Sequence, residues 1–262
     1  MRQFKTLWKG MAAALAGGLL LCASSSEEEA ALTAEGKGLV RIGLSADTGF
    51  STQTKAVDES EYENLENYTV QIWKDGSQEG SDYTYGDIEG QLIELDERGT
   101  YTVKAFMGED IAASRNSMYV VGSQDVVIAN EPKDVSFTCK PVCAKVKVVF
   151  DSSMEQYFEN YSVNFYTKAL GEGNFQWLAS DTDPVYLKVD NEEPVTAIIN
   201  LTKKDGVKAD ATITRNYTLS PLMSKTITIK PTVSQGSIGI SITIDSSTND
   251  QEVDIEVPAD WV

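Results

Sequence analysis

Short runs in which apolar and polar residues alternate recur along the chain from residue 38 onward. In GLVRIGLSAD (38–47), the valine, isoleucine and leucine at positions 40, 42 and 44 are separated by arginine, glycine and serine. A period of two places these apolar side chains on one face of a β-strand, so the pattern predicts a half-buried strand. Similar runs follow in NYTVQIW (67–73), QLIEL (91–95), TYTVKAF (100–106), SMYVVG (117–122), DVVIA (125–129) and DVSFTC (134–139).

The alternation restarts beyond Pro141 and continues toward the C-terminus. Turn residues such as Asp75-Gly76 separate the runs, and this spacing is typical of β-sandwiches. Only residues 57–65 and 153–158 favour a helical turn or two, so we predict an all-β fold. The later runs are AKVKVVFD (144–151), NYSVNFY (160–166), PVYLKV (184–189), PVTAIINLT (194–202), ATITRNYTL (211–219), KTITIK (225–230), SIGISITID (237–245) and EVDIEV (252–257).

Two of these segments resemble each other, which indicates an internal repeat. ENYTVQIW (66–73) and ENYSVNFY (159–166) each follow a run that ends in aspartate. Chance is the alternative, because tyrosine, threonine and valine are favoured in strands generally. With domains usually roughly 100–150 residues long, the repeat predicts two tandem antiparallel β-sandwich modules, at residues 38–140 and 141–262.

The first residues have the features of an export signal. Arg2, Lys5 and Lys9 precede an uncharged stretch from Met11 to Leu21, which is the basic and then apolar order of a secretory signal. The apolar stretch is shorter than the roughly 20 residues that a transmembrane helix needs. We therefore predict a cleaved signal peptide at residues 1–21.

Cys22, directly after this stretch, predicts a lipid anchor. The preceding Leu-Leu-Leu matches a lipoprotein signal only in part: Leu21 directly precedes the cysteine, where a small residue is usual. An ordinary cut after the small residues 23–25 is the alternative. We favour lipidation of Cys22, since acyl chains add roughly 0.8 kcal/mol of membrane affinity per buried CH₂. Residues 22–37 have a single large apolar side chain and predict a flexible acidic tether.

The charge balance excludes several classes of function. The formal net charge is −18 at pH 7, which disfavours nucleic acid, because binding it requires lysine and arginine to neutralise phosphates. Histidine is absent from the sequence, so the usual general base and the commonest metal ligand are missing. A carboxylate pair is the remaining route to acid–base catalysis. We predict a protein that is not an enzyme and that has no cofactor.

Cys139 and Cys143, in TCKPVCAK, are close in sequence. In a straight strand, four steps of about 3.3 Å would place their Cα atoms near 13 Å apart, whereas a disulfide needs less than about 7 Å. Pro141 could bend the strand, and export favours oxidation. We favour two buried thiols and retain a Cys139–Cys143 disulfide as the alternative.

Two further features of the sequence are candidates for binding sites. DSSTNDQEVDIE (245–256) has oxygen-bearing residues at several EF-hand positions, but Asp250 stands where such a loop needs glycine, and strands flank it. We therefore predict a hairpin loop there and no metal site. Trp177, in NFQWL, is the residue that we expect to contact a ligand if the chain binds glycans. Packing in the core is the alternative for this tryptophan.

A resemblance to a known family is carried by TYTVKAF, SMYVVGSQDV, VSFTCKPVCAKVKVVFD, ENYSVNF, VYLKVD and GISITIDSSTNDQEVDIEVPADW. Together these segments resemble a family of uncharacterised lipoproteins of Bacteroidota that is catalogued as a domain of unknown function. The resemblance covers nearly the whole chain after Lys37, and the final VPADW is among its more specific parts. It implies export, a lipid anchor at Cys22 and two β-rich modules, and it implies no catalytic residues. The family is in turn loosely similar to fimbrillin-type pilins and anchors.

The leading functional hypothesis is a lipid-anchored protein of the outer membrane that faces the cell exterior and acts as an adhesion, assembly or binding module. Glu27, Glu28 and Glu29, just after Cys22, are similar to the export signals that send lipoproteins to the outer face. The membrane, other surface proteins and glycans are the expected partners. One alternative is a minor fimbrial subunit or anchor, which would lend a strand to its neighbour. The other is a glycan-binding module of a polysaccharide-uptake system.

Overall fold

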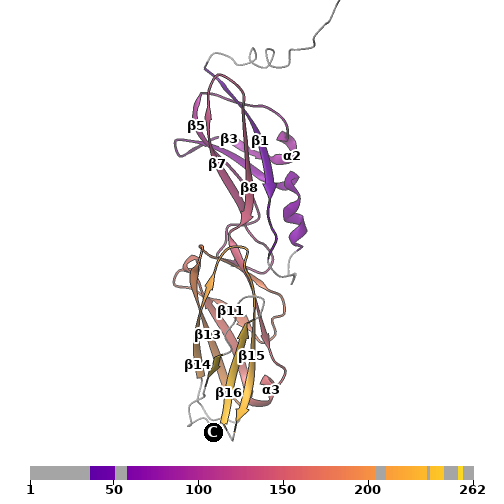
Figure 1. The fold of residues 1–262 in the computed structure, drawn as a ribbon, viewed down its shortest axis with the longest axis vertical. Helices are drawn as coiled ribbons and strands as arrows, with labels where there is room; N and C mark the ends of the chain where they lie inside the picture. The colour runs from indigo at the N-terminus through magenta and orange to yellow at the C-terminus, as the bar shows by residue number, and fades with distance from the viewer. Residues whose placement is uncertain (1–35, 51–57, 205–210, 235–236, 245–252, 256–262) are drawn as a thin grey trace, which may run out of the picture.

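The computed structural model describes residues 36–50, 58–204, 211–234, 237–244 and 253–255. They form a mostly β protein with three sheets and a few short helices, which confirms the coarse prediction from the alternating runs. The molecule is elongated, with the strands before residue 141 at one end and most of the later strands at the other (Figure 1). The predicted signal peptide and most of the tether lie outside the described residues.

The first half forms one seven-stranded sheet in the order β3-β2-β5-β7-β8-β1-β4. β7 and β8 pair only at Val120↔Pro141 and Val121↔Lys140, so the sheet is joined weakly there and folds over a single core. The strands are β1 (Gly38–Ala46), β2 (Thr69–Lys74), β3 (Ser77–Thr84), β4 (Ile93–Leu95), β5 (Gly99–Met107), β7 (Val120–Ile128) and β8 (Lys133–Pro141).

Short helices connect β1 to β2 and β3 to β4: η1 (Glu59–Glu63), η2 (Leu65–Asn67) and α2 (Tyr85–Ile88). The side chains of Asp58 and Asn64 cap η1 and η2 by accepting backbone N–H bonds at 3.2 Å. The helical turns predicted in residues 57–65 are therefore present. Within the described part of the chain, no helix is long and apolar enough to cross a membrane.

The second half contains two sheets, one of four strands (β11-β10-β13-β14) and one of six (β17-β16-β15-β9-β12-β6). β6 (Ala113–Ser114) comes from the first half of the chain and pairs with β12. The remaining elements are β9 (Cys143–Phe150), α3 (Met154–Tyr157), β10 (Phe158–Tyr166), η3 (Lys168–Leu170), β11 (Phe175–Leu178), β12 (Val185–Lys188), β13 (Glu193–Lys203), β14 (Ala211–Leu219), β15 (Ser224–Ser234), β16 (Ser237–Ile244) and β17 (Val253–Ile255).

The two halves repeat the same strand order. The series β3-β2-β5-β7 and β8-β1-β4 of the first half correspond to β11-β10-β13-β14 and β15-β9-β12 of the second. The segment ENYTVQIW (66–73) runs from η2 into β2, and the matching segment ENYSVNFY (159–166) lies within the equivalent strand β10. Their alternate residues are buried at the same places, Val70 and Ile72 in one and Val163 and Phe165 in the other. The second half adds β16 and β17 next to β15.

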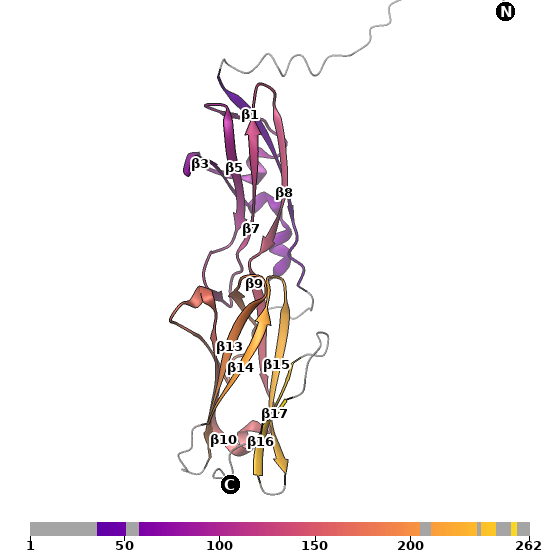
Figure 2. The ribbon, with the colours of Figure 1, turned by 60° about the vertical axis from the view of Figure 1, so that its left-hand side comes forward.

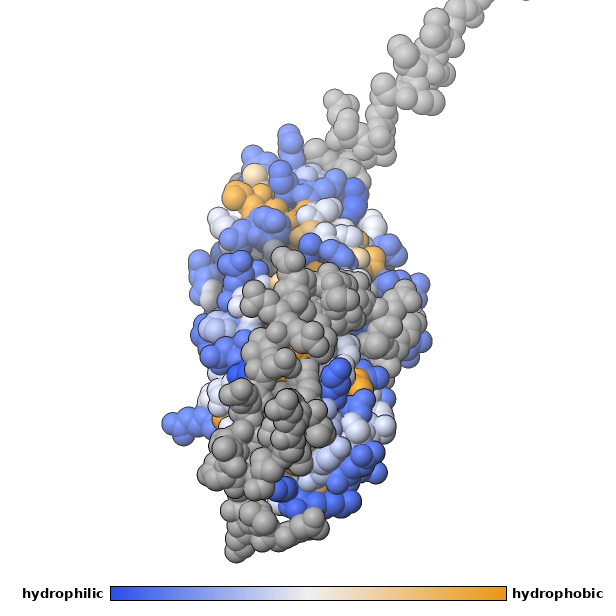
Figure 3. Space-filling view, turned by 60° about the horizontal axis from the view of Figure 1, so that its bottom comes forward, coloured by the Kyte–Doolittle hydropathy of each residue, from blue (hydrophilic) through white to orange (hydrophobic). Residues whose placement is uncertain are grey.

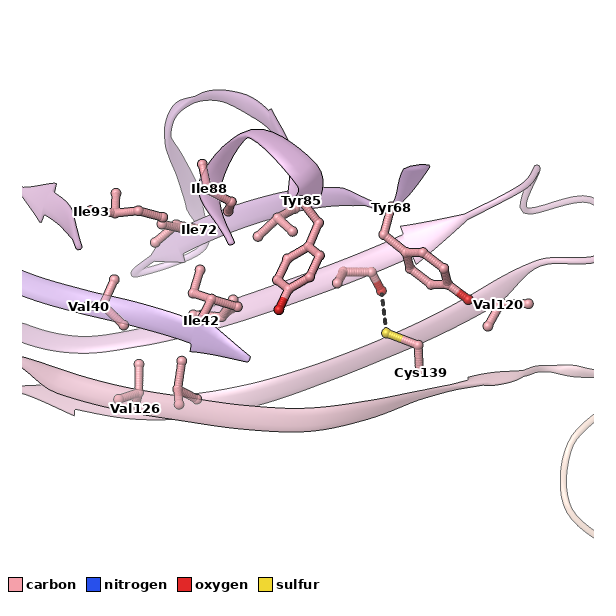
Figure 4. Close-up of a cluster of buried hydrophobic side chains, with 14 of the residues drawn as sticks. Val40, Ile42, Tyr68, Ile72, Tyr85, Ile88, Ile93, Val120, Val126 and Cys139 are labelled. Atoms are coloured by element: carbon pink, nitrogen blue, oxygen red, sulfur yellow. Dashed lines mark hydrogen bonds between the residues drawn. The ribbon is translucent and has the colours of Figure 1, made fainter. Parts of the chain in front are cut away.

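Each half has its own cluster of buried apolar side chains. In the first cluster, Val40 and Ile42 of β1 face Ile72 of β2 and Tyr85 of α2 (Figure 4). Cys139 of β8 lies near Tyr68 in the same cluster. In the second, Trp177 is the largest fully buried side chain. Alternation along the strands therefore predicts burial well in both halves.

The prediction of purely antiparallel sheets was wrong. β1 pairs with β8 in parallel, from Val40↔Lys133 to Ala46↔Cys139, and β9 pairs with β15 in parallel. In each case the first strand of a half pairs with a strand that follows after several intervening elements, so no hairpin imposes the antiparallel direction. A period of two reports which face is buried and carries no information on direction.

Candidate functional site

Several predicted site residues lie outside the described part of the structure. These are Cys22 and the export-signal residues Glu27, Glu28 and Glu29. Most of segment 245–256, for which a hairpin loop without a metal is predicted, also lies outside the described residues. Among the residues that are described, no three histidine, cysteine, aspartate or glutamate side chains are grouped so that they could hold a metal ion.

Trp177 cannot serve as a sugar platform in this structure, so its predicted ligand contact was wrong. The side chain lies on the core face of β11 and is 0% exposed. The guanidinium carbon of Arg115 lies 4.3 Å from the Trp177 ring, and Arg115 Nη2 binds Asp181 Oδ2 at 2.7 Å. Arg115 directly follows β6, so a residue from the first half of the chain packs over the Trp177 ring. The cation–π contact between the guanidinium and the indole stabilises this packing.

Cys139 and Cys143 are both buried, free thiols, and the structure does not contain the alternative disulfide. Cys139 Sγ donates a weak hydrogen bond to the carbonyl oxygen of Ala105 at 3.6 Å (Figure 4). Burial raises the pKa of Cys139 to about 11. Burial, and secondarily the negative charge of Glu59, raise the pKa of Cys143 to about 12. Both sulfurs are therefore protonated at neutral pH and poor nucleophiles.

We expect neither thiol to react with a thiol reagent at pH 8 while the protein is folded, because the thiolate is scarce and the sulfurs are covered. In denaturant, both should react at the rate of an ordinary cysteine. Mass spectrometry after iodoacetamide treatment measures this, and a variant with an exposed cysteine at Ser123 supplies the positive control. Rapid labelling of Cys139 or Cys143 in the native protein would contradict the structure.

The junction between the halves holds a buried charge cluster. Lys145 of β9, only 1% exposed, donates to Glu59 Oε1 at 2.8 Å, and the Tyr186 hydroxyl of β12 donates to the same oxygen at 2.9 Å. The Phe50 ring lies 5.0 Å from the lysine nitrogen and 5.7 Å from the Tyr186 ring. Glu59 belongs to η1 of the first half, so this cluster ties the two halves together.

Alternation explains why β9 and β12 can serve both halves. On β9, Ala144, Val146 and Val148 face the core of the second half, whereas Cys143 belongs to the core of the first. On β12, Val185 and Leu187 face the second core and Tyr186 the first. The sequence analysis missed Lys145, because in AKVKVVFD it alternates with valine as a solvent-facing residue does. The first four residues of β9 are all buried. Both faces of the strand are covered there because the first half packs against the face that would otherwise be exposed.

A groove on the described surface contains the side chain of a half-buried tryptophan, Trp73. Trp73 of β2 lines a hollow of about 520 Å³ together with residues of β5 and β7. Its indole Nε1 donates to Gln71 Oε1 at 3.3 Å, and nearby Thr102 donates to Asp125 Oδ1 at 2.6 Å. On the face that Figure 3 shows, hydrophilic residues dominate the described surface, and apolar residues form only small groups.

The fold and surface define a mostly β protein of two stacked halves, with hydroxyl-rich and carboxylate-rich grooves. The chain belongs to the family described as "Domain of unknown function (DUF4493)", whose model matches residues 36–259. This confirms the resemblance noted from the sequence. No curated protein matches the chain.

The solved structures that match the chain include proteins of Bacteroides, Parabacteroides and Porphyromonas. A protein of Bacteroides ovatus that is proposed to be an adhesin is 9% identical, with a TM-score of 0.47, over 83% of this chain and 95% of that one. A fimbrial assembly protein of Parabacteroides distasonis is 12% identical, with a TM-score of 0.41, over 84% and 98%. The fimbrial anchor protein Mfa2 of Porphyromonas gingivalis is 13% identical, with a TM-score of 0.41, over 81% and 99%. At these scores the similarity supports no functional argument.

Proposed function

We propose that this protein is a non-enzymatic surface lipoprotein, anchored in the outer membrane through Cys22 and facing the exterior, that acts as an adhesion, assembly or binding module. The outer-membrane location is supported by the predicted signal peptide (1–21), by Cys22 and by the acidic residues Glu27–Glu29. Residues 38–140 and 141–262 are proposed as its two modules, because each holds a separate core.

The observation that carries the proposal is the end-to-end stacking of the two halves. β1 starts at the end of the molecule distant from the second half (Figures 1 and 2). A lipid on Cys22 would therefore hold the first half near the membrane and direct the second half outward. The buried Glu59–Lys145 contact between the halves resists bending at the junction, as a spacer that presents a binding surface requires.

The anchor is tested by labelling cells with radioactive palmitate. We expect the wild type to be labelled and the Cys22→Ser variant to be unlabelled, because an acyl chain needs that sulfur. Cys139→Ser is the matched control and should keep the label. Equal labelling of wild type and Cys22→Ser would rule out the anchor. Protease shaving of whole cells tests exposure, and replacing Glu27–Glu29 with alanine should reduce cleavage.

The fimbrial alternative requires a strand that can be lent to a neighbour. The C-terminal run EVDIEV is the candidate from sequence, but β17 (Val253–Ile255) already pairs with β16 of the same chain, from Ile240↔Ile255 to Ile242↔Val253. Because β17 is already paired within this chain, it is a poor candidate for donation to a neighbour. We therefore keep the fimbrial subunit as the alternative to the proposed function.

The glycan-binding alternative now depends on Trp73 instead of Trp177. The Trp73 groove combines an aromatic ring with hydroxyl and carboxylate groups of Thr102 and Asp125, the side chains that stack on and hydrogen-bond to sugars. On a glycan array, we expect Trp73→Ala to lose any binding that the wild type shows. Binding retained by this variant would exclude the groove.

A further inference from the structure

A chain of hydrogen bonds holds the Trp73 side chain in position on the outward face of the first half. The indole Nε1 donates to Gln71 Oε1 at 3.3 Å, and Gln71 Nε2 donates to Asp82 Oδ1 at 3.0 Å. Gln78 Nε2 donates to the same carboxylate oxygen at 2.7 Å. Asp82 belongs to the bulge of β3 that lies opposite Gln71. Because the ring is fixed in this way, little conformational freedom is lost when a ligand stacks on it.

The charges that line the Trp73 groove are separated along the strands. Trp73 lies opposite Thr102, which in turn lies opposite Asp125. Asp75 lies beyond Trp73, at the turn between β2 and β3. Lys104 lies two residues beyond Thr102 on β5, on the side away from this turn, so the two Cα atoms are about 7 Å apart. Carboxylates therefore line one end of the groove, and an ammonium group lines the other.

The ammonium group of Lys104 contacts aromatic rings. Its Nζ lies 5.2 Å from the centre of the Phe106 ring and 5.9 Å from the centre of the Tyr119 ring. Among the residues that the structure describes, no carboxylate forms an ion pair with it, whereas surface lysines such as Lys37 and Lys188 do have such partners. A cation–π contact holds the ammonium without neutralising its charge. Lys104 is therefore available to an anionic group that enters the groove.

We propose that the Trp73 groove binds acidic sugars, with a sugar ring stacked on the Trp73 indole and the carboxylate of that sugar paired with Lys104. This inference rests on the glycan-binding alternative above and names the class of glycan. The Thr102 hydroxyl and the Asp125 carboxylate supply hydrogen bonds for sugar hydroxyls. A ligand carboxylate at the Lys104 end lies away from Asp75 and Asp125, so the separated charges fix the direction in which the sugar lies.

Calorimetric titration of the purified protein with oligomers of galacturonic, glucuronic and mannuronic acid tests the proposal, and their methyl esters are the neutral counterparts. We expect at least one acid oligomer to bind about tenfold more tightly than its ester, the usual effect of one hydrogen bond to a charged group. Lys104→Met should abolish this preference, whereas Lys104→Arg, which keeps the charge, should retain it. Lys147→Met, at a half-buried outward position of β9, is the matched control and should leave binding unchanged.

Circular dichroism melting confirms that each variant is folded, and Lys104→Gln serves if Lys104→Met is not. Equal affinity for acid and ester, or acid binding that is unchanged without the lysine, would overturn the proposal and leave the glycan-binding alternative standing. Acid binding that survives Trp73→Ala would also overturn it, because the site would then lie outside the groove. If no acid or ester binds, the proposal fails, and the glycan array decides whether the glycan-binding alternative fails with it. Palmitate labelling of Cys22 is independent of all these results.

Discussion

Replacing Glu59 with glutamine is expected to lower the free energy of unfolding by about 3 kcal/mol, because it leaves a buried lysine without its counter-charge. Lys145 is 1% exposed, and Glu59 is its carboxylate partner at 2.8 Å. The Tyr186 hydroxyl, which donates to the same oxygen, would keep an acceptor in the amide. Loss of charge therefore dominates the effect. Urea unfolding followed by circular dichroism measures it.

Two further variants separate the charge from the general effects of substitution. Glu94→Gln removes the carboxylate of the exposed Lys37–Glu94 pair, and it should cost less than about 1 kcal/mol, as surface pairs do. Adding Lys145→Met to Glu59→Gln should restore most of the lost stability, since an apolar side chain needs no partner there. If Glu59→Gln were no more harmful than Glu94→Gln, the junction would not depend on this ion pair.

Replacing Trp177 with alanine is expected to destabilise the protein by about 3–5 kcal/mol, the usual cost of removing a buried aromatic side chain. Trp177 is fully buried, packs in the core of the second half and lies beneath Arg115. Removing the indole leaves a cavity and deprives the guanidinium of its aromatic contact. Thermal and urea unfolding measure the change.

Trp177→Phe is the matched control and should lose less stability, because it keeps a ring in the same place. Trp73→Ala should cost much less than Trp177→Ala, since Trp73 is only half-buried on an outward face. An unfolding transition of Trp177→Ala that coincides with the wild type would contradict the burial. Reduced glycan binding by Trp177→Ala alone would be evidence of unfolding and not of a sugar contact.

Most strands could be predicted because their apolar residues recur every second position. The run ATITRNYTL coincides with β14, and TYTVKAF lies within β5. β3 was missed because Ser77–Thr84 has mostly exposed, polar residues. It becomes a strand because Asp75 and Gly76, with φ of 50° and 80°, form a tight turn that places it against β2. SMYVVG and DVVIA join into β7, since β5 pairs along the whole segment.

The candidate site residues were less predictable from sequence. Trp177 and Trp73 both occur in alternating runs, and composition does not distinguish the buried ring from the half-exposed one. Lys145 and Arg115 look like ordinary surface charges in sequence. Each is placed in contact with the other half of the chain, more than sixty residues away, by the stacking of the halves.

By itself, the sequence determined the β class, the inner and outer faces of most strands and the internal repeat, because these follow from local spacing and strand preference. Tertiary structure alone decided that β1–β8 and β9–β15 run parallel and that β6 joins the second half. It also decided that Lys145 is buried against Glu59. These features depend on contacts between residues far apart in the chain, which a local pattern does not encode.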